Sequence, residues 1–151
     1  MTRHLPSSNT ILFASGLFLL LACRADAGLL VTNFFFNTVD LYDDQTGELI
    51  QPGYFAPTVE PGNLLGLTGI VIDPANDHVY VSSRFMDRIY VFDGATGRPL
   101  ASAPGGQPGL FAQLPSGSQP AGLAIDSDGN LYVANNGGAV VNILDPSAAQ
   151  I

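Results

Sequence analysis

Two short apolar runs separated by a polar turn recur along the chain. Residues 123–125 and 131–134 are apolar, and residues 126–130 between them read Asp-Ser-Asp-Gly-Asn. Asp and Asn hydrogen-bond their own backbone in turns, and Gly accepts a positive φ. The pattern predicts two strands joined by a tight turn. Residues 69–83 repeat the same order of apolar and polar positions.

The repeat extends over a unit of about fifty residues. Two apolar segments and one polar turn recur with a shift of fifty: 29–33, 39–42 and 43–47 become 79–83, 89–92 and 93–97. A third copy follows with a shift of about fifty-two, at 131–135, 140–144 and 145–146. Further strands are predicted at 48–50, 69–72 and 122–125. Because residues 69–72 are apolar at every position except Gly69, we expect an inner strand that is buried on both faces.

Two linkers separate the units, at residues 51–67 and 101–119. Both are rich in Pro and Gly, and both carry isolated aromatic residues, namely Tyr54, Phe55 and Phe111. Loops of this length in a compact domain favour a rim or binding role, or local disorder. No segment after the N-terminal leader shows a helical period.

Four-stranded units at a period of forty to fifty residues are typical of β-propeller blades. Residues 119–135, QPAGLAIDSDGNLYVAN, resemble an NHL repeat, whose pattern is P-x-G-I-A-V-D, a turn, and G-N-(V/L)-Y-V-A-(D/N). The second unit is similar but has Asp77-His78 where Gly-Asn is expected. The resemblance implies an all-β fold, a partial β-propeller of four-stranded antiparallel blades. It places blades at 28–50, 68–101 and 120–145 within a propeller segment at 28–151.

The predicted blade count is low for a closed ring. Three strands of a first blade, all four of a second and three of a third make ten predicted strands, or about two and a half blades, whereas closed propellers typically have four to eight. The chain is then a fragment of a longer protein, an open arc with exposed edges, or one half of a homodimer that closes a ring. We favour the fragment.

The first 27 residues have the composition of a secretory signal peptide. A basic start at Arg3 and His4 precedes a twelve-residue apolar run at 11–22, and Ala25-Asp26-Ala27 forms an A-x-A cleavage site. The run is too short to span a bilayer. We therefore expect a secreted or periplasmic protein. The alternative is that Leu20-Leu21-Ala22-Cys23 is a lipoprotein box, in which case Cys23 carries lipid and anchors the protein to the bacterial membrane.

The charge balance argues against nucleic acid as a partner. The chain has five Arg or Lys and thirteen Asp or Glu residues. Cleavage after Ala27 removes two of the basic and one of the acidic residues, which leaves a net charge of −9. Such a surface repels phosphate backbones. A membrane is expected as a partner only if Cys23 is lipidated.

No metal or other cofactor is expected. Asp126-x-Asp128-Gly129 is similar to part of a calcium loop, which leaves Ca²⁺ as a weak alternative, but the remaining ligands of an EF-hand are missing. A hairpin turn is the favoured interpretation. Gluconolactonase-like propellers hold a divalent metal at the ring centre. The resemblance implies that a metal-binding Asn would stand just before the Gly that opens each blade. Here Thr68 and Ala121 occupy that position.

No catalytic residue is expected, and we lean against an enzyme. His78 lies in a predicted turn, where a solvated side chain is the favoured interpretation. Ser82 and Ser83 stand at a strand end without the G-x-S-x-G context of a nucleophile.

Equivalent strand ends predict a binding surface. Residues 33, 83 and 135 end the same strand of three successive units, and the loops that follow contain aromatic, Arg and Asn residues. We expect the ligand-binding residues to be Asn33, Phe34, Phe35, Ser83, Arg84, Asn135 and Asn136. The alternative for residues 34–36 is packing between blades. The predicted function is an exported, non-catalytic propeller module that binds a protein or glycan partner. The alternative is a fragment of a lactonase- or lyase-like six-bladed propeller enzyme.

Overall fold

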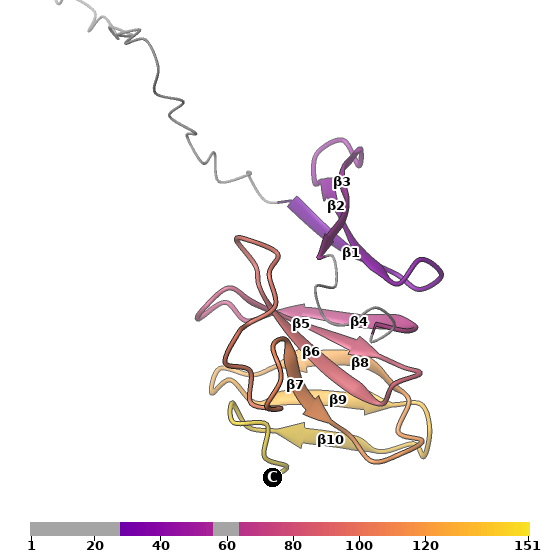
Figure 1. The fold of residues 1–151 in the computed structure, drawn as a ribbon, viewed down its shortest axis with the longest axis vertical. Helices are drawn as coiled ribbons and strands as arrows, with labels where there is room; N and C mark the ends of the chain where they lie inside the picture. Colours follow the sequence, from indigo (N-terminus) through magenta and orange to yellow (C-terminus); the bar gives the residue numbers. More distant parts are fainter. Residues whose placement is uncertain (1–27, 56–63) are drawn as a thin grey trace, which may run out of the picture.

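The computed structural model describes residues 28–55 and 64–151. The predicted signal peptide, Cys23 and residues 56–63 of the first predicted linker lie outside the described residues. The described part of the chain contains ten strands in the order shown in Figure 1: β1 (Gly28–Asn33), β2 (Thr38–Asp43), β3 (Leu49–Phe55), β4 (Leu67–Ile72), β5 (His78–Ser83), β6 (Arg88–Asp93), β7 (Leu110–Gln113), β8 (Pro120–Ile125), β9 (Leu131–Asn135) and β10 (Val141–Leu144).

The strands form three antiparallel sheets, each a meander in chain order. The first sheet is β1-β2-β3, the second is β4-β5-β6-β7, and the third is β8-β9-β10. In each sheet the pairing is antiparallel throughout. The predicted all-β, antiparallel fold class is confirmed. Among the described residues, no helix is both long and apolar enough to cross a membrane.

Aspartate side chains close the predicted polar turns. The Oδ1 atom of Asp43 accepts hydrogen bonds from the backbone N–H and the hydroxyl of Thr46, at 2.7 and 2.9 Å. Asp93 makes the same pair of contacts with Thr96, both at 2.7 Å. These bonds satisfy the turn backbone where it leaves the strand ladder, and so fix the end of β2 and of β6.

Two strands differ from the sequence prediction. β3 continues to Phe55 instead of ending at residue 50. The fourth strand of the second sheet is β7, inside the predicted linker 101–119, whereas the position directly after the turn contributes only a bridge between Pro99 and Phe92. Pro99 has no N–H to donate to a ladder, so a continuous strand cannot run through it.

The aromatic residues of the predicted linkers belong to the core. Phe55 is fully buried and stacks on Phe92 of β6, with ring centroids 5.0 Å apart. Phe111 is also buried and meets Tyr80 edge to face at 5.0 Å. The expectation that these segments form a rim, a binding surface or disordered loops is therefore wrong for Phe55 and Phe111.

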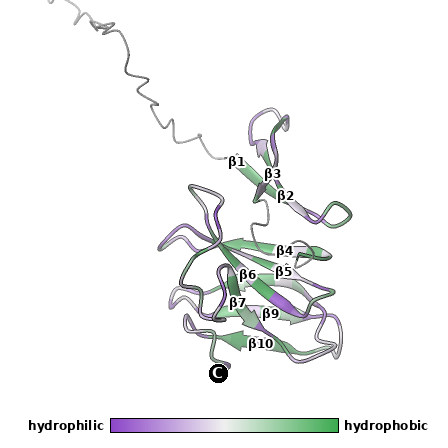
Figure 2. Cartoon of the chain, viewed as in Figure 1, coloured by the Kyte–Doolittle hydropathy of each residue, from purple (hydrophilic) through white to green (hydrophobic). Residues whose placement is uncertain are grey.

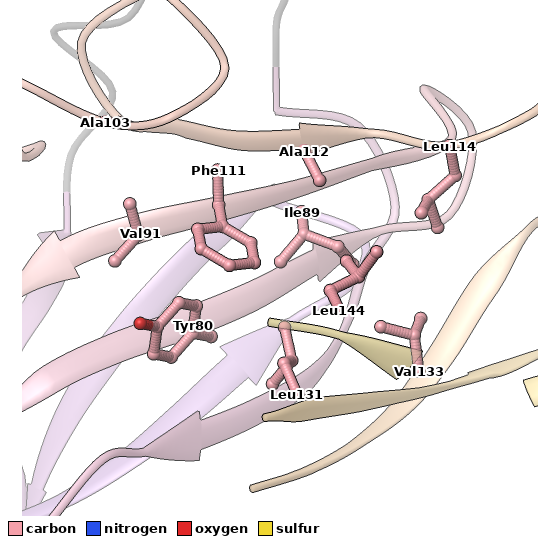
Figure 3. Close-up of a cluster of buried hydrophobic side chains, with 10 residues drawn as sticks. All are labelled: Tyr80, Ile89, Val91, Ala103, Phe111, Ala112, Leu114, Leu131, Val133 and Leu144. Carbon is pink, nitrogen blue, oxygen red and sulfur yellow. The ribbon is translucent and has the colours of Figure 1, made fainter. Parts of the chain in front are cut away.

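The second sheet lies between the other two and is buried on both faces (Figure 1). One of its faces packs on the first sheet through Val79, Val81, Tyr90, Phe92 and Leu110. Its other face packs on the third sheet, and this cluster is shown in Figure 3: Tyr80, Ile89, Val91, Ala103, Phe111, Ala112 and Leu114 meet Leu131, Val133 and Leu144. The strands with continuous burial are β5 and β6, while β4 is only half-buried and Ile72 is exposed.

Hydroxyl groups on β1, β4 and β5 link the three sheets. The Thr32 hydroxyl donates to the Thr68 carbonyl oxygen at 2.8 Å, and the Thr68 hydroxyl donates to the Pro120 carbonyl oxygen at 3.0 Å. The Ser82 hydroxyl donates to the Ala121 carbonyl oxygen at 2.8 Å. β4 approaches β8 so closely that a methyl group on Gly69 would collide with the Ala121 carbonyl oxygen. These contacts fix the position of the second sheet relative to the first and third sheets.

Candidate functional site

Two loops of the same shape form the base of the candidate site. The β1–β2 loop and the β5–β6 loop each have four residues and end on a residue with positive φ, 55° at Asn37 and 52° at Asp87. Asn and Asp tolerate this backbone region better than other residues with side chains. The turn is therefore encoded by the same residue class at positions fifty apart.

The final residue of each loop binds the segment before the next sheet. The Asn37 side-chain oxygen accepts a hydrogen bond from the Gly66 N–H at 2.7 Å. The Asp87 carboxylate accepts one from the Gln119 N–H at 2.7 Å and a second from the Gly117 N–H at 2.8 Å. The last residue of each loop is thereby fixed to the segment that precedes the next sheet.

An aromatic patch covers the place where these loops meet. The Phe34 ring contacts Phe35 and Phe85 edge to face, with centroids 5.5 and 5.4 Å apart. Phe35 is 87% exposed and Phe85 is 64% exposed, and the adjacent Phe36 is exposed as well. We call Phe34, Phe35, Phe36 and Phe85 the aromatic patch. Figure 2 shows the hydrophobic tip of the β1–β2 loop standing away from the sheets.

Gly66 makes room for the patch. Its carbonyl oxygen accepts a hydrogen bond from the Arg84 N–H at 2.9 Å, which holds the β5–β6 loop against it. A Cβ atom at Gly66 would lie 2.7 Å from the Phe85 ring and 3.2 Å from the Phe34 ring, and the φ of Gly66 is +65°. A residue with a side chain would therefore be strained at this position and would displace both rings.

A polar edge adjoins the patch on the side of the third sheet. The Arg84 Nη2 atom donates to the Gln119 side-chain oxygen at 3.2 Å, and the Asn136 N–H donates to the Gln119 carbonyl oxygen at 3.0 Å. The Arg84 Nε atom is buried and has no hydrogen-bond partner among the described residues. Such a donor carries a desolvation cost until a water or a ligand accepts its hydrogen bond.

The other predicted site residues are hydrogen-bonded beneath the loops. Ser83 is fully buried, and its hydroxyl donates to the Leu65 carbonyl oxygen at 2.8 Å. Asn33 donates to the Asp40 carboxylate at 3.5 Å and accepts from the Phe36 N–H at 3.2 Å. Asn135 is buried and donates to the Asn142 side-chain oxygen. The structure thus brings Phe34, Phe35 and Arg84 together at the surface, with Asn136 beside them, and places Asn33, Ser83 and Asn135 as supports.

A buried carboxylate lies under the β1–β2 loop. Asp40 accepts hydrogen bonds from the Gly53 N–H at 2.8 Å and the Thr38 hydroxyl at 2.9 Å. The Gly53 N–H is the main cause of a lowered Asp40 pKa, and the hydrogen bonds from Thr38 and Asn33 add to it against the opposing effect of burial. Asp40 is therefore anionic at neutral pH and holds Asn33 in place.

The Asp126 carboxylate is used within its own turn. Its Oδ1 accepts from the Asp128 and Asn130 N–H groups, both at 2.9 Å, and its Oδ2 accepts from the Asn130 side chain and the Tyr132 hydroxyl at 3.0 and 3.1 Å. The bonds from Asn130 are the largest cause of a lowered Asp126 pKa. The predicted hairpin turn between β8 and β9 is confirmed. No group of three or more His, Cys, Asp or Glu side chains that could hold a metal ion occurs in residues 28–55 and 64–151.

The sequence prediction missed the residues that tie the loops down. Asn37, Gly66, Asp87 and Gln119 were not among the expected site residues. The signal for two of them was present, because an Asn or Asp precedes the next strand at positions 37 and 87, fifty residues apart. The backbone partners, Gly66 and Gln119, are set by the packing of one sheet on the next.

The comparisons with known proteins support the fold. No protein-family model matches the sequence, and no curated protein does. A solved structure described as the extracellular domain of a hybrid two-component system from B. thetaiotaomicron is similar, with a TM-score of 0.56 and 18% sequence identity. The match covers 82% of this chain and 16% of that chain, so the chain spans about a sixth of the length of the solved structure that it matches. At this level of identity the likeness concerns the fold.

Proposed function

We propose that the chain is an exported, non-catalytic segment of an NHL-like β-propeller, which binds a partner through the aromatic patch. Three consecutive meander sheets related by shifts of fifty to fifty-two residues, with the middle sheet buried on both faces, support the propeller interpretation. The sequence of residues 1–27 supports export. The extracellular location stated for the similar solved structure agrees with it.

The exposed phenylalanine cluster carries the proposal. Exposed aromatic side chains that are held on fixed loops bury a large apolar area when a partner covers them, about 1.5–3 kcal/mol for each fully buried ring. The side chains of Arg84 and Gln119 supply polar groups at the edge. This combination of apolar centre and polar rim is that of a protein-binding hot spot. We therefore favour a protein as the partner and treat a glycan as the second candidate.

The test compares binding by matched variants. The chain is immobilised as bait, alongside a Phe35→Ser and Phe85→Ser double variant and an Ile50→Ser control. Ile50 is exposed on β3, outside the patch. The baits are presented to extracellular proteins from the source organism and to an array of glycans.

A ligand that binds the chain and the control but not the double variant supports the proposal and shows which class of partner is bound. A ligand held equally by all three baits would rule out the patch as the binding surface.

A further inference from the structure

Within residues 28–55 and 64–151, each of the two outer sheets leaves one apolar face uncovered by another sheet. Strand residues alternate between faces, so one face of the first sheet packs on the second sheet through Leu30 and Val39, and the other face carries Leu29 and Val31. The third sheet packs on the second through Leu131, Val133 and Leu144. Its outer face carries Tyr132, Ala134, Val141 and Ile143.

The repeat shows what normally covers the outer face of the first sheet. A shift of fifty residues relates Leu29 to Val79 and Val31 to Val81. Val79 is 0% exposed because the preceding sheet covers it, whereas Leu29 is 54% exposed. The outer face of the first sheet is thus equivalent to a face that, in the second sheet, lies against another sheet of the same kind.

The outer face of the third sheet is equivalent to the face of the second sheet that packs on the third sheet. A shift of fifty-two residues relates Tyr132 to Tyr80 and Val141 to Ile89. Ile89 is 0% exposed beneath the third sheet, whereas Val141 is 59% exposed. Tyr80 is buried against Phe111 and the third sheet, whereas Tyr132 is exposed. This face is equivalent to one that receives the next sheet in the series.

We propose that these two faces bind each other between copies of this chain, the third sheet of one copy packing on the first sheet of a second copy. The chain already contains this interface twice, between its first and second and its second and third sheets. We take the occupant to be a second copy in a head-to-tail contact, and a wild-type chain that stays monomeric would point instead to a further sheet of the same protein. Two copies with three sheets each make six, a number within the range of closed propellers, so the contact forms twice and closes a ring.

Polar groups on the outer face of the first sheet allow this contact. Asp40 and Tyr42 share the face with Leu29 and Val31. The Asp40 carboxylate is already almost fully buried, with hydrogen bonds from Gly53, Thr38 and Asn33. Covering the outer face of the first sheet therefore does not leave the Asp40 charge without hydrogen-bond partners. The outer face of the third sheet presents apolar side chains beside the Tyr132 hydroxyl, which is bonded to Asp126.

The test is the molar mass of the purified chain in solution, measured by light scattering across a dilution series. We expect a dimer that dissociates on dilution. Leu29→Asp and Val141→Asp, at exposed positions on the two opposite faces, should each give a folded monomer, with folding checked by circular dichroism. Ile50→Asp, a similarly exposed apolar position on β3, should remain dimeric.

Mixing the two monomeric variants distinguishes a head-to-tail contact from a symmetric one. The Val141→Asp variant keeps an intact first sheet and the Leu29→Asp variant keeps an intact third sheet, so the mixture should form a one-to-one heterodimer. A wild-type chain that stays monomeric overturns the proposal, as does a mixture that stays monomeric while the wild type dimerises. Open-ended growth of wild-type oligomers would overturn ring closure. The Leu29→Asp and Val141→Asp variants keep the aromatic patch, so partner binding can be measured on the monomers, and partner binding and self-association can fail independently.

Discussion

The Asp87 carboxylate accepts a hydrogen bond from the Gln119 N–H at 2.7 Å, and the Asn37 side chain, fifty residues earlier, accepts one from the Gly66 N–H at the same distance. Each bond ties the end of one loop to the start of the next sheet. The Asp87 carboxylate also accepts a hydrogen bond from the Gly117 N–H, and the backbone φ of Asp87 is 52°. One side chain therefore serves both the turn and the contact between the second and third sheets.

Asp87→Ala should lower the free energy of unfolding by about 2–4 kcal/mol, because it removes two charge-assisted hydrogen bonds and places Ala in the left-handed region. Asp87→Asn is the matched control, since Asn occupies the equivalent position 37 and keeps one acceptor. We expect it to lose about half as much. Urea unfolding of both variants checks this. Equal losses in the two variants would show that the hydrogen bonds do not set the stability of this contact.

Gly69→Ala should destabilise the chain by about 1–3 kcal/mol, because the added methyl group meets the Ala121 backbone and forces β4 away from β8. Gly122→Ala on β8 is the control. A Cβ atom there lies 3.7 Å from the Ala134 Cβ, which is an ordinary contact. The control should be neutral or slightly stabilising in thermal unfolding. A neutral Gly69→Ala variant would contradict the close approach of the two strands.

Local chemistry made most of the hairpins predictable from sequence. The Asp-x-x-Thr-Gly turns at 43–47 and 93–97 and the Asp-Ser-Asp-Gly-Asn turn at 126–130 fix the ends of β2, β6 and β8 through bonds within a few residues. Their recurrence at a fixed shift then identifies equivalent strands. β7 was missed because the fourth strand of this sheet was expected directly after the turn at 93–97, where Pro99 prevents a continuous strand. The strand that pairs with β6 comes only after a Gly- and Pro-rich loop. Pairing at that distance depends on tertiary packing and leaves no local pattern.

The candidate site was predictable in composition but not in arrangement. The loop positions of Phe34, Phe35 and Arg84 follow from the repeat. The contact between Phe34 and Phe85 does not, because it depends on how the first sheet packs on the second and on the space left at Gly66. Ser83 and Asn135 occupy strand ends that were expected to lie at the binding surface, but both are buried and donate hydrogen bonds beneath the loops. The Asn135 Oδ1 atom has no partner among the described residues.

Stability should fall in acid through the turn carboxylates. The pKa of Asp43 is lowered chiefly by the Thr46 N–H, that of Asp93 by the Thr96 hydroxyl, and that of Asp145 by the Ser147 hydroxyl. A carboxyl whose pKa is lower in the folded state contributes stability above its unfolded pKa of 3.8, and this contribution is lost as the pH falls through the folded value. Urea midpoints should therefore be constant near neutral pH and decline below about pH 5.

Thr96→Val isolates one of these turns. It removes the hydroxyl that is the largest cause of the lowered Asp93 pKa but keeps the backbone bond. The Asp93 pKa, followed by NMR titration of its carboxyl carbon, should rise toward 3.8, while the pKa of Asp126 stays unchanged. An unchanged Asp93 pKa would mean that the hydroxyl bond does not persist in solution.

Phe55 is an aromatic residue of the core, whereas Phe35 lies on the surface. It is fully buried against Phe92 between the first and second sheets, so Phe55→Ala should lower the free energy of unfolding by about 3–5 kcal/mol. Phe35→Ala is the matched control, because Phe35 is exposed in the aromatic patch and its truncation should change stability by less than about 0.5 kcal/mol. Denaturant unfolding of both variants provides the comparison. A small effect at position 55 would place this residue in a loop, as the sequence alone suggested, and would remove the stack that joins the first sheet to the second.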